Sequence, residues 1–274
     1  MTLTHVALLL ITGAGAGFAA GLLGLGGAFI MTPVQYIIFT DAGLPSDVAV
    51  RLAFGTSLMV VLPTAISGAW RHHHKGVVWW RAAFIMGICG LIFAFVGATL
   101  SVYLPGAILK AAFGVIVILS AARMVIGRQP RIAPEPVTNH WILLAWAIPI
   151  GLISGIFGIG GAVLMIPVMV VALRFEMHKA VATSMAVIIF TAIGGTTGYI
   201  INGLGVPDLP PYSIGYVNLP SWVLLSVTSI GMAQVGAIAA HKLSANLLKY
   251  FFAVVMLYMG LRMIGVFDWL GWPI

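Results

Sequence analysis

Charged residues are scarce in this sequence. Asp, Glu, Lys and Arg make up only 7% of its 274 residues, whereas soluble domains contain about 25%. So few polar groups cannot cover a water-facing surface. The hydrophobic residues, 61% of the total, form stretches of roughly 20, the length that crosses a bilayer as a helix. Segments of alternating polarity, which a membrane β-barrel requires, are absent from the sequence. The sequence therefore predicts an all-α membrane protein.

Cysteine and acidic residues are also few. The single cysteine, Cys89, excludes an intramolecular disulfide and a cysteine-based metal site. The six acidic residues lie in expected loops or helix ends, which argues against the buried carboxylate relay of proton-coupled carriers. No nucleophile–base pair or metal cluster falls within an expected span. The sequence therefore predicts neither an enzyme nor a cofactor nor a metal site.

Lys and Arg outnumber the acidic residues by 13 to 6, giving a net charge of +7. They gather in short loops such as 71–76 and 127–131. Basic residues at such positions orient membrane spans, so nucleic acid is not an expected partner.

Glycine, in contrast, is abundant and patterned. The segment GLLGLGGAFIMTP at 21–33 returns as GIFGIGGAVLMIP at 155–167. With four flanking residues included, the two segments share eight identities at an offset of 134, and a Thr-Ser pair follows each of them. The sequence therefore predicts a first transmembrane repeat over residues 1–127, a cytoplasmic linker over 128–140 and a second transmembrane repeat over 141–274.

Each repeat is expected to contain four parts. A long apolar segment interrupted by glycines comes first, and three uninterrupted spans follow. In the first repeat these parts cover residues 6–23 with 28–40, then 49–70, 80–102 and 107–126. In the second repeat they cover 141–157 with 161–173, then 180–201, 221–240 and 246–265.

Loop charges indicate how the repeats face the membrane. Loop 71–81 and the linker are basic and are expected in the cytoplasm, whereas loop 40–47 carries two Asp residues and is expected outside. In the second repeat the basic loops, 174–179 and 241–242, fall at the other positions. The repeats are therefore predicted to be inverted, with each glycine break at the tip of a helical hairpin. One long kinked span per break, with parallel repeats, is the alternative.

The glycine breaks are the candidate functional sites. Non-helical backbone within a membrane must be buried in protein or line a cavity, and paired broken helices at mid-membrane are typical of transporter binding sites. A helix that begins at such a break directs free N–H groups and its positive dipole end toward it, which suits an anion. Close packing of small residues is the alternative, and it is favoured for Gly13, Gly17 and Gly21. Hydroxyls of the two Thr-Ser pairs can either donate to the anion or bond within their own helix. The expected substrate-binding residues are Gly24, Gly26, Gly27, Ala28, Thr56, Ser57, Gly158, Gly160, Gly161, Ala162, Thr183 and Ser184.

The duplicated Gly-x-Gly-Gly-x-x-x-x-x-Pro motifs and the paired Thr-Ser residues resemble the sulfite exporter TauE/SafE family of bacterial membrane permeases. The likeness covers nearly the whole chain. It implies a multi-pass permease of the cytoplasmic (inner) membrane of a bacterium. Such a permease moves small sulfur-containing anions of the sulfite, sulfonate or sulfoacetate class, and we expect export by alternating access around the two breaks. The expected partners are this anion and the lipid bilayer, with a homodimer as an open option.

Two other interpretations remain open at this point. One is a cation or metal transporter that uses the histidine tract His72–His74, although Arg71 and Lys75 beside it would repel a cation and no acidic residue or cysteine joins it. The other is a membrane assembly protein that transports nothing.

Overall fold

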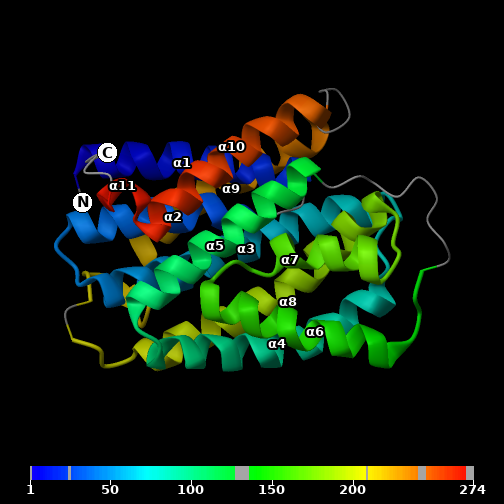
Figure 1. Cartoon of the computed structure of the whole chain (residues 1–274), viewed down its shortest axis with the longest axis horizontal. Helices are drawn as coiled ribbons and strands as arrows, with labels where there is room; N and C mark the ends of the chain where they lie inside the picture. Colours follow the sequence, from blue (N-terminus) through cyan, green and yellow to red (C-terminus); the bar gives the residue numbers. More distant parts are fainter. Residues whose placement is uncertain (1, 24–25, 127–135, 208, 240–244, 270–274) are drawn as a thin grey trace.

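The computed structural model describes residues 2–23, 26–126, 136–207, 209–239 and 245–269. These residues are mostly helical, and the long helices lie roughly along the longest axis of the molecule (Figure 1). Of the described helices, seven are long and apolar enough to cross a membrane, which confirms the all-α membrane fold. In chain order the elements are α1 (Leu3–Leu23), α2 (Ala28–Asp41), α3 (Ser46–His74), α4 (Trp80–Tyr103), α5 (Gly106–Ile126), α6 (His140–Phe157), α7 (Ala162–Pro167), the π-helical η1 (Val168–Ala172), α8 (Met177–Gly203), β1 (Ser213–Ile214), β2 (Val217–Asn218), α9 (Leu219–Ala239), α10 (Ala245–Ile264) and α11 (Val266–Trp269).

The predicted spans agree with the observed helices to within a few residues, but two features were not predicted. Segment η1 follows Pro167, whose ring removes an N–H from the α-helical ladder, and the helix widens into a π-turn there. The antiparallel hairpin β1–β2 lies in the loop between α8 and α9. It is docked on α8 because the N–H of Tyr216 donates to the carbonyl of Tyr199 at 3.1 Å.

Each glycine-broken segment is a hairpin that starts and finishes at one end of the bundle. At the ends of α1 and α2, His5 Nε2 lies 3.0 Å from Asp41 Oδ2. In the second repeat, the N–H of Val137, just before α6, donates to the carbonyl of Leu173, just after η1, at 3.0 Å. The two hairpins begin at opposite ends of the molecule, as the positions of α1 and α6 in Figure 1 show.

The other helices also run in opposite directions in the two repeats. Gly106 N donates to Asp47 Oδ1 at 2.8 Å, so α3 and α5 begin at one end, which we call the acidic end because it carries Asp41 and Asp47. Trp79 N donates to Thr183 Oγ1 at 3.1 Å, so α4 and α8 begin at the other end, the basic end. Corresponding helices such as α3 and α8 are therefore antiparallel, and the side of the membrane that each end faces stays a prediction.

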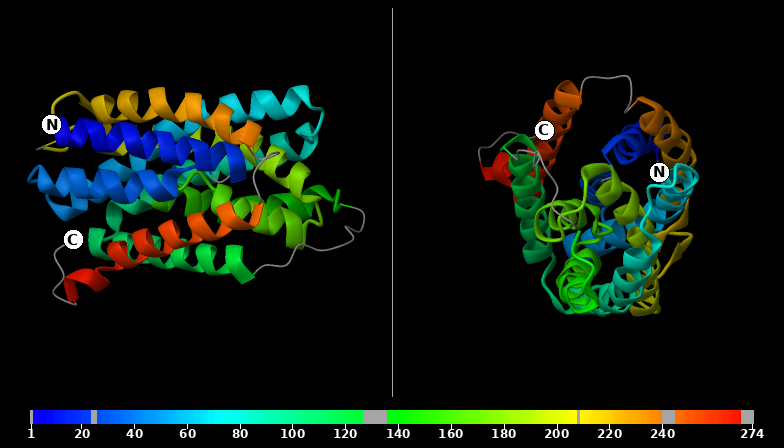
Figure 2. Two further views of the ribbon diagram at one scale, coloured as in Figure 1. Left: turned by 90° about the horizontal axis from the view of Figure 1, so that it is seen from above. Right: turned by 90° about the vertical axis from the view of Figure 1, so that its right-hand side faces the viewer.

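Small residues pack the long arm of each hairpin against a helix of the other repeat. A Cβ placed at Gly21 of α1 would stand 1.9 Å from the carbonyl oxygen of Ala233 on α9, and one at Gly155 of α6 would stand 2.0 Å from that of Ala94 on α4. The views in Figure 2 show α1 alongside α9. The packing interpretation of Gly13, Gly17 and Gly21 is thus confirmed, because all three face α9 at distances that admit no side chain.

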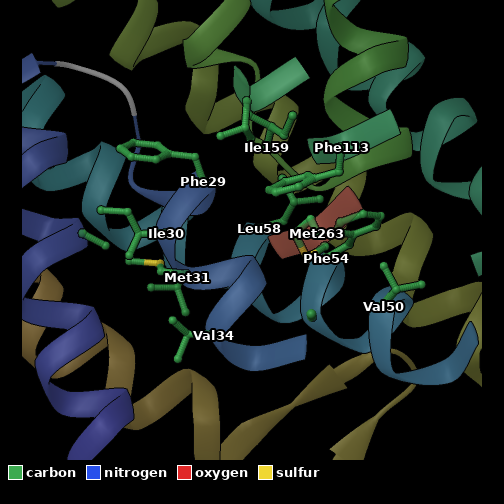
Figure 3. Close-up of a cluster of buried hydrophobic side chains, with 14 of the residues drawn as sticks. Phe29, Ile30, Met31, Val34, Val50, Phe54, Leu58, Phe113, Ile159 and Met263 are labelled. Atoms are coloured by element: carbon green, nitrogen blue, oxygen red, sulfur yellow. The ribbon is translucent and has the colours of Figure 1, made fainter. Parts of the chain in front are cut away.

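Helices α3 and α8 cross at the centre of the bundle, and both contribute buried side chains to the core. Leu58 of α3 presses on Gly195 of α8, and Met185 of α8 presses on Gly68 of α3. These contacts are equivalent, since Leu58 and Met185 each follow the first residue of a Thr-Ser pair by two positions. Figure 3 shows Leu58 beside buried side chains of α5 and of the second glycine break. The crossing therefore joins both hairpins to one core.

Candidate functional site

Both glycine breaks contain backbone that only glycine adopts readily. The φ angles are +73° at Gly26 and +74° at Gly27, and they are +63°, +75° and +84° at Gly158, Gly160 and Gly161. An L-residue with a Cβ is strained at such values. The five glycines are buried, so the breaks lie inside the protein rather than in lipid.

The helices that follow the breaks begin without caps. Helix α2 starts at Ala28 and α7 at Ala162, and in the described structure neither start has a side-chain hydrogen bond. Ile30 and Leu164 donate to the last glycine carbonyl of their breaks, both at 3.1 Å. The N–H groups before them have no intrahelical acceptor. Gly24 lies outside the described residues.

The two breaks meet at the crossing of α3 and α8. Ala28 belongs to a buried cluster that contains Val61 of α3 and Ile188 of α8. A Cβ placed at Gly160 would stand 3.1 Å from Val61 and 3.6 Å from Ile188. Val61 and Ile188 hold corresponding positions in the two repeats, five residues after Thr56 and Thr183. One apolar contact therefore separates two buried, uncapped helix starts.

A serine without a partner lies beside the second break. Ser154 of α6 is fully buried, and among the described residues its hydroxyl has no hydrogen-bond partner. A Cβ at Gly161 would stand 3.5 Å from that oxygen. The corresponding residue of the first repeat is Ala20. The second break thus has a spare hydroxyl that the first lacks.

The threonines of the two Thr-Ser pairs join the repeats. Thr56 Oγ1 accepts from the N–H of Asn218 at 2.9 Å, and Thr183 Oγ1 accepts from the N–H of Trp79 at 3.1 Å. Asn218 and Trp79 immediately precede α9 and α4, so each threonine holds the start of a helix from the other repeat. The sequence analysis did not predict this structural role, and anion binding by the two hydroxyls stays a prediction.

The serine of the first pair belongs to a buried polar cluster. Ser57 Oγ accepts from Thr32 Oγ1 at 2.9 Å and from Gln35 Nε2 at 2.8 Å. All three side chains are 0% exposed, and within the described part of the chain Gln35 Oε1 has no partner. Sequence reasoning missed this cluster. Its only signal in the sequence was Thr32 and Gln35, two polar residues in an otherwise apolar stretch of the short arm of the first hairpin.

The corresponding place in the second repeat is apolar. Ile166 and Met169 stand at the positions of Thr32 and Gln35, and Ser184 donates to a carbonyl of its own helix, one turn back, at 2.9 Å. The two repeats therefore share a backbone and differ in the groups beside it.

A further hydroxyl, also missed, reaches the second break. Thr191 Oγ1 donates to the carbonyl of Gly160 at 3.0 Å. Its counterpart Thr64 contacts Ser229 of α9 instead, at 2.8 Å. Each threonine follows the first residue of its Thr-Ser pair by eight positions, so a comparison of the repeats beyond that pair would have found them.

A cavity of about 340 Å³ lies between α5 and the segment formed by α7 and η1. Val163 and Leu164 line it next to the second break, and Arg123 lines it toward the basic end. Leu119 and Val171 on its wall are 63% and 60% exposed. Apolar side chains that are this exposed are typical of a lipid-facing surface. We therefore interpret this cavity as a groove open to the bilayer.

The histidine tract lies at the end of α3, against tryptophans. His73 Nδ1 accepts from Trp80 Nε1 at 3.0 Å, and the ring of His74 packs edge-on against Trp70 at 4.8 Å. Among the residues that the structure describes, no group of three or more His, Cys, Asp or Glu is placed to hold a metal ion.

A helical bundle in which two broken helices place their starts at a buried centre has the architecture of a membrane transporter. The sequence comparisons define the class further. The chain belongs to the sulfite exporter TauE/SafE family, whose model matches residues 9–263. It is a multi-pass transporter of the cytoplasmic membrane.

The relatives of the chain are proteins named as probable membrane transporters. One from Methanocaldococcus jannaschii is 33% identical over 260 residues, which cover 94% of each chain. One from Haemophilus influenzae is 29% identical and covers 95% of this chain and 98% of its own. One from Bacillus subtilis is 26% identical with the same coverage. No solved structure matches the chain.

Proposed function

We propose that the protein moves small sulfur-containing anions of the sulfite, sulfonate or sulfoacetate class, in the direction of export, by alternating access. The site that would hold the anion is the pair of glycine breaks. The free N–H groups at the starts of α2 and α7 would be its donors, and Ser154 would add a hydroxyl.

The convergence of two uncapped helix starts on one buried contact carries this proposal. An anion between them would receive hydrogen bonds and a favourable dipole from both helices. In this conformation Val61 and Ile188 occupy the space between the breaks. Binding therefore requires these side chains to separate. Separation toward one end at a time would expose the site to one side of the membrane at a time.

The membrane potential can supply the energy for export. Asp41, Asp47 and Glu176 lie at or beside helix ends, and no carboxylate within the described ranges lies at the breaks. Each negative charge that leaves a negative-inside cell gains about 2.3 kcal/mol per 100 mV. That energy corresponds to a concentration ratio of roughly fiftyfold.

Purified protein in liposomes tests this function. We expect flux of isotope-labelled sulfite or sulfoacetate that follows an imposed potassium diffusion potential and persists without a proton gradient. Strict dependence on a proton gradient would overturn the proposed energy source. Absence of flux for every anion of the class would overturn the substrate.

A matched pair of glycine variants tests the site. Gly161 and Gly43 both have positive φ, +84° and +89°, and a Cβ at Gly161 makes only ordinary contacts from 3.5 Å. A Cβ at Gly43 meets nothing within 4 Å in the described structure. Gly161→Ala and Gly43→Ala should therefore lose similar stability, while only Gly161→Ala should weaken anion transport. Equal transport by the two variants would remove the second break from the site.

A further inference from the structure

Helices α3 and α9 meet through polar side chains between the breaks and the basic end. Thr64 Oγ1 lies 2.8 Å from Ser229 Oγ. One turn further, Gln234 Nε2 donates to Ser67, and Arg71 donates to Gln234 Oε1 at 2.8 Å. We call this contact the α3–α9 seam and define it by these five residues. Because the Thr64 hydroxyl also donates to a carbonyl of its own helix, the Ser229 hydroxyl is the donor across the seam.

Burial decreases along the seam toward the basic end. Thr64 and Ser229 are 1% and 0% exposed, whereas Ser67, Arg71 and Gln234 are only partly buried. The inner end of the seam is thus closed in this conformation, and the outer end reaches the surface.

The inner end of the seam also contains an unsatisfied hydroxyl. Ser226 is 6% exposed, and its oxygen has no hydrogen-bond partner among the residues described. It lies on the same face of α9 as Trp222 and Ser229, four residues after one and three before the other. Both of those residues contact α3 by hydrogen bonds. A buried hydroxyl without a partner is costly, and a ligand oxygen or a water in an opened seam would satisfy it.

A proline divides α3 at the point where the seam begins. Pro63 has no N–H, so the carbonyl of Met59, four residues earlier, lacks its helical donor. Trp222 Nε1 donates to that carbonyl at 3.1 Å. The corresponding residue of α8 is Phe190. Because Pro63 removes one helical hydrogen bond, the half of α3 toward the basic end can bend at this position relative to the rest of the helix.

The equivalent contact between α8 and α4 is built differently. The seam residues of α3 correspond to Thr191, Gly194 and Gly198 of α8. A Cβ at Gly194 would stand 2.0 Å from the carbonyl oxygen of Leu91, and one at Gly198 would stand 2.7 Å from Ala98 Cβ. Close-packed backbones of this kind leave no space for water and lose many contacts on separation. The α8–α4 contact is therefore suited to stay closed, and the α3–α9 seam is suited to open.

Arg71 places a positive charge at the outer end of the seam. Over the described ranges, no carboxylate lies within ion-pair distance of its guanidinium, and its Nε is buried without a hydrogen-bond partner. A guanidinium presents several donors in one plane and matches two oxygens of one oxyanion.

We propose that the α3–α9 seam is the route of the anion between the basic end and the glycine breaks, and that Arg71 supplies the charge that holds the anion there. This inference rests on the proposed function, because it assigns a path to the same anion. The anion replaces the amide oxygen of Gln234 on Arg71 and then takes hydrogen bonds from Ser67, Ser229 and Ser226 on its way inward. The chemistry selects an oxyanion with at least two exposed oxygens.

Concentration-dependent flux in liposomes tests the role of Arg71. Arg71→Gln should raise the half-saturating concentration of sulfite about tenfold or more, since a charge-assisted hydrogen bond is lost. Arg71→Lys should lie between this variant and the wild type. Arg123→Gln is the matched control, because it removes the same charge from the last turn of α5, outside the seam, and it should stay within about twofold. Equal behaviour of Arg71→Gln and Arg123→Gln overturns the inference and leaves the proposed function intact. Absence of flux in the wild type overturns both.

Cysteine accessibility gives a second test that does not depend on Arg71. Cys89 is replaced by alanine, and Thr64→Cys and Ala98→Cys are then compared, since both side chains are at most 1% exposed and Ala98 lies beside Gly198 in the α8–α4 contact. A membrane-impermeant maleimide is added to inverted membrane vesicles. We expect modification of the cysteine at position 64, slowed by sulfoacetate, and none at position 98. Equal modification of both positions, or of neither, contradicts an opening seam.

Discussion

The two glycine-broken hairpins have the same backbone but different surroundings. Around the first, Thr32, Gln35 and Ser57 form a buried polar cluster. Around the second, Ile166 and Met169 stand in place of the first two. Duplication therefore preserved the turn and the helix start, which depend on glycine, and did not preserve the side chains beside them. The repeated motif therefore supplies the shape of the candidate site, and we propose that the unrepeated residues beside it supply its selectivity.

We expect the largest effect from substitutions in α1 and α6, the long arms of the hairpins, and they test whether the two arms are equivalent. Gly21→Leu and Gly155→Leu should each prevent folding, because a Cβ would stand 1.9 Å and 2.0 Å from backbone oxygens of α9 and α4. Overpacking of side chains alone costs about 1–3 kcal/mol, and separating two backbones costs more. The measurement is the yield of monodisperse protein after size-exclusion chromatography in detergent. Gly15→Leu is the control, because a Cβ there meets nothing within 4 Å in the residues described. Normal yield from either of the first two variants would show that this arm tolerates separation.

A smaller effect should separate the polar cluster from its apolar counterpart. Gln35→Leu removes a buried amide that donates to Ser57 at 2.8 Å. Anion flux should then fall about tenfold, which corresponds to the loss of one or two hydrogen bonds of the polar cluster. Met169→Leu changes the corresponding residue while conserving its volume, and flux should stay within about twofold. Initial flux rates at equal amounts of folded protein make the comparison. Equal losses in both variants would mean that the polar cluster has no special role.

The next comparison concerns the two threonines that join the repeats. Thr56→Val leaves the N–H of Asn218, a residue that is 1% exposed, without its acceptor. The expected loss of stability is about 1–3 kcal/mol. Thr183→Val should cost less, because Trp79 is only partly buried and water can replace the hydroxyl. Thermal unfolding in one detergent measures both, and a larger loss for Thr183→Val would contradict this order.

The smallest effect concerns the ends of the hairpins. His5 and Asp41 join the first hairpin through side chains, and Asp41 is 70% exposed. Asp41→Asn should therefore change the stability by less than about 1 kcal/mol. The second hairpin is joined through the backbones of Val137 and Leu173, which no side-chain substitution removes. A loss of stability well above 1 kcal/mol on thermal unfolding would show that the His5–Asp41 contact stabilises the protein more than its exposure predicts.

Much of the fold could be predicted because the relevant properties are local. Length and apolarity define a span wherever it lies, and the glycines mark the breaks. The loop charges predict the opposite directions of the two repeats, with which the contacts of Asp47 and Trp79 agree. The hairpin β1–β2 was missed because it depends on contacts, whereas Pro167 marks a weak position in its helix but does not by itself specify the π-turn of η1. The hairpin forms where Tyr216 meets α8, and no pattern of hydrophobicity encodes that meeting.

The candidate site could be predicted only in part. Positive φ at Gly26, Gly27, Gly160 and Gly161 agrees with the breaks inferred from the motif. The cluster around Ser57 depends on how α2 is rotated against α3, and the role of Thr56 depends on where α9 begins. Both are relations between distant segments, which a single sequence does not contain.

The long arm of each hairpin packs against a helix of the other repeat, and this has a consequence for biosynthesis. The neighbour of α1 is α9, which begins only at Leu219, whereas α6 finds α4 already made. The ribosome must therefore deliver most of the chain before α1 can dock. Until then its glycine face lacks its final neighbour, so α1 is made well before α9 but reaches its final place only after it.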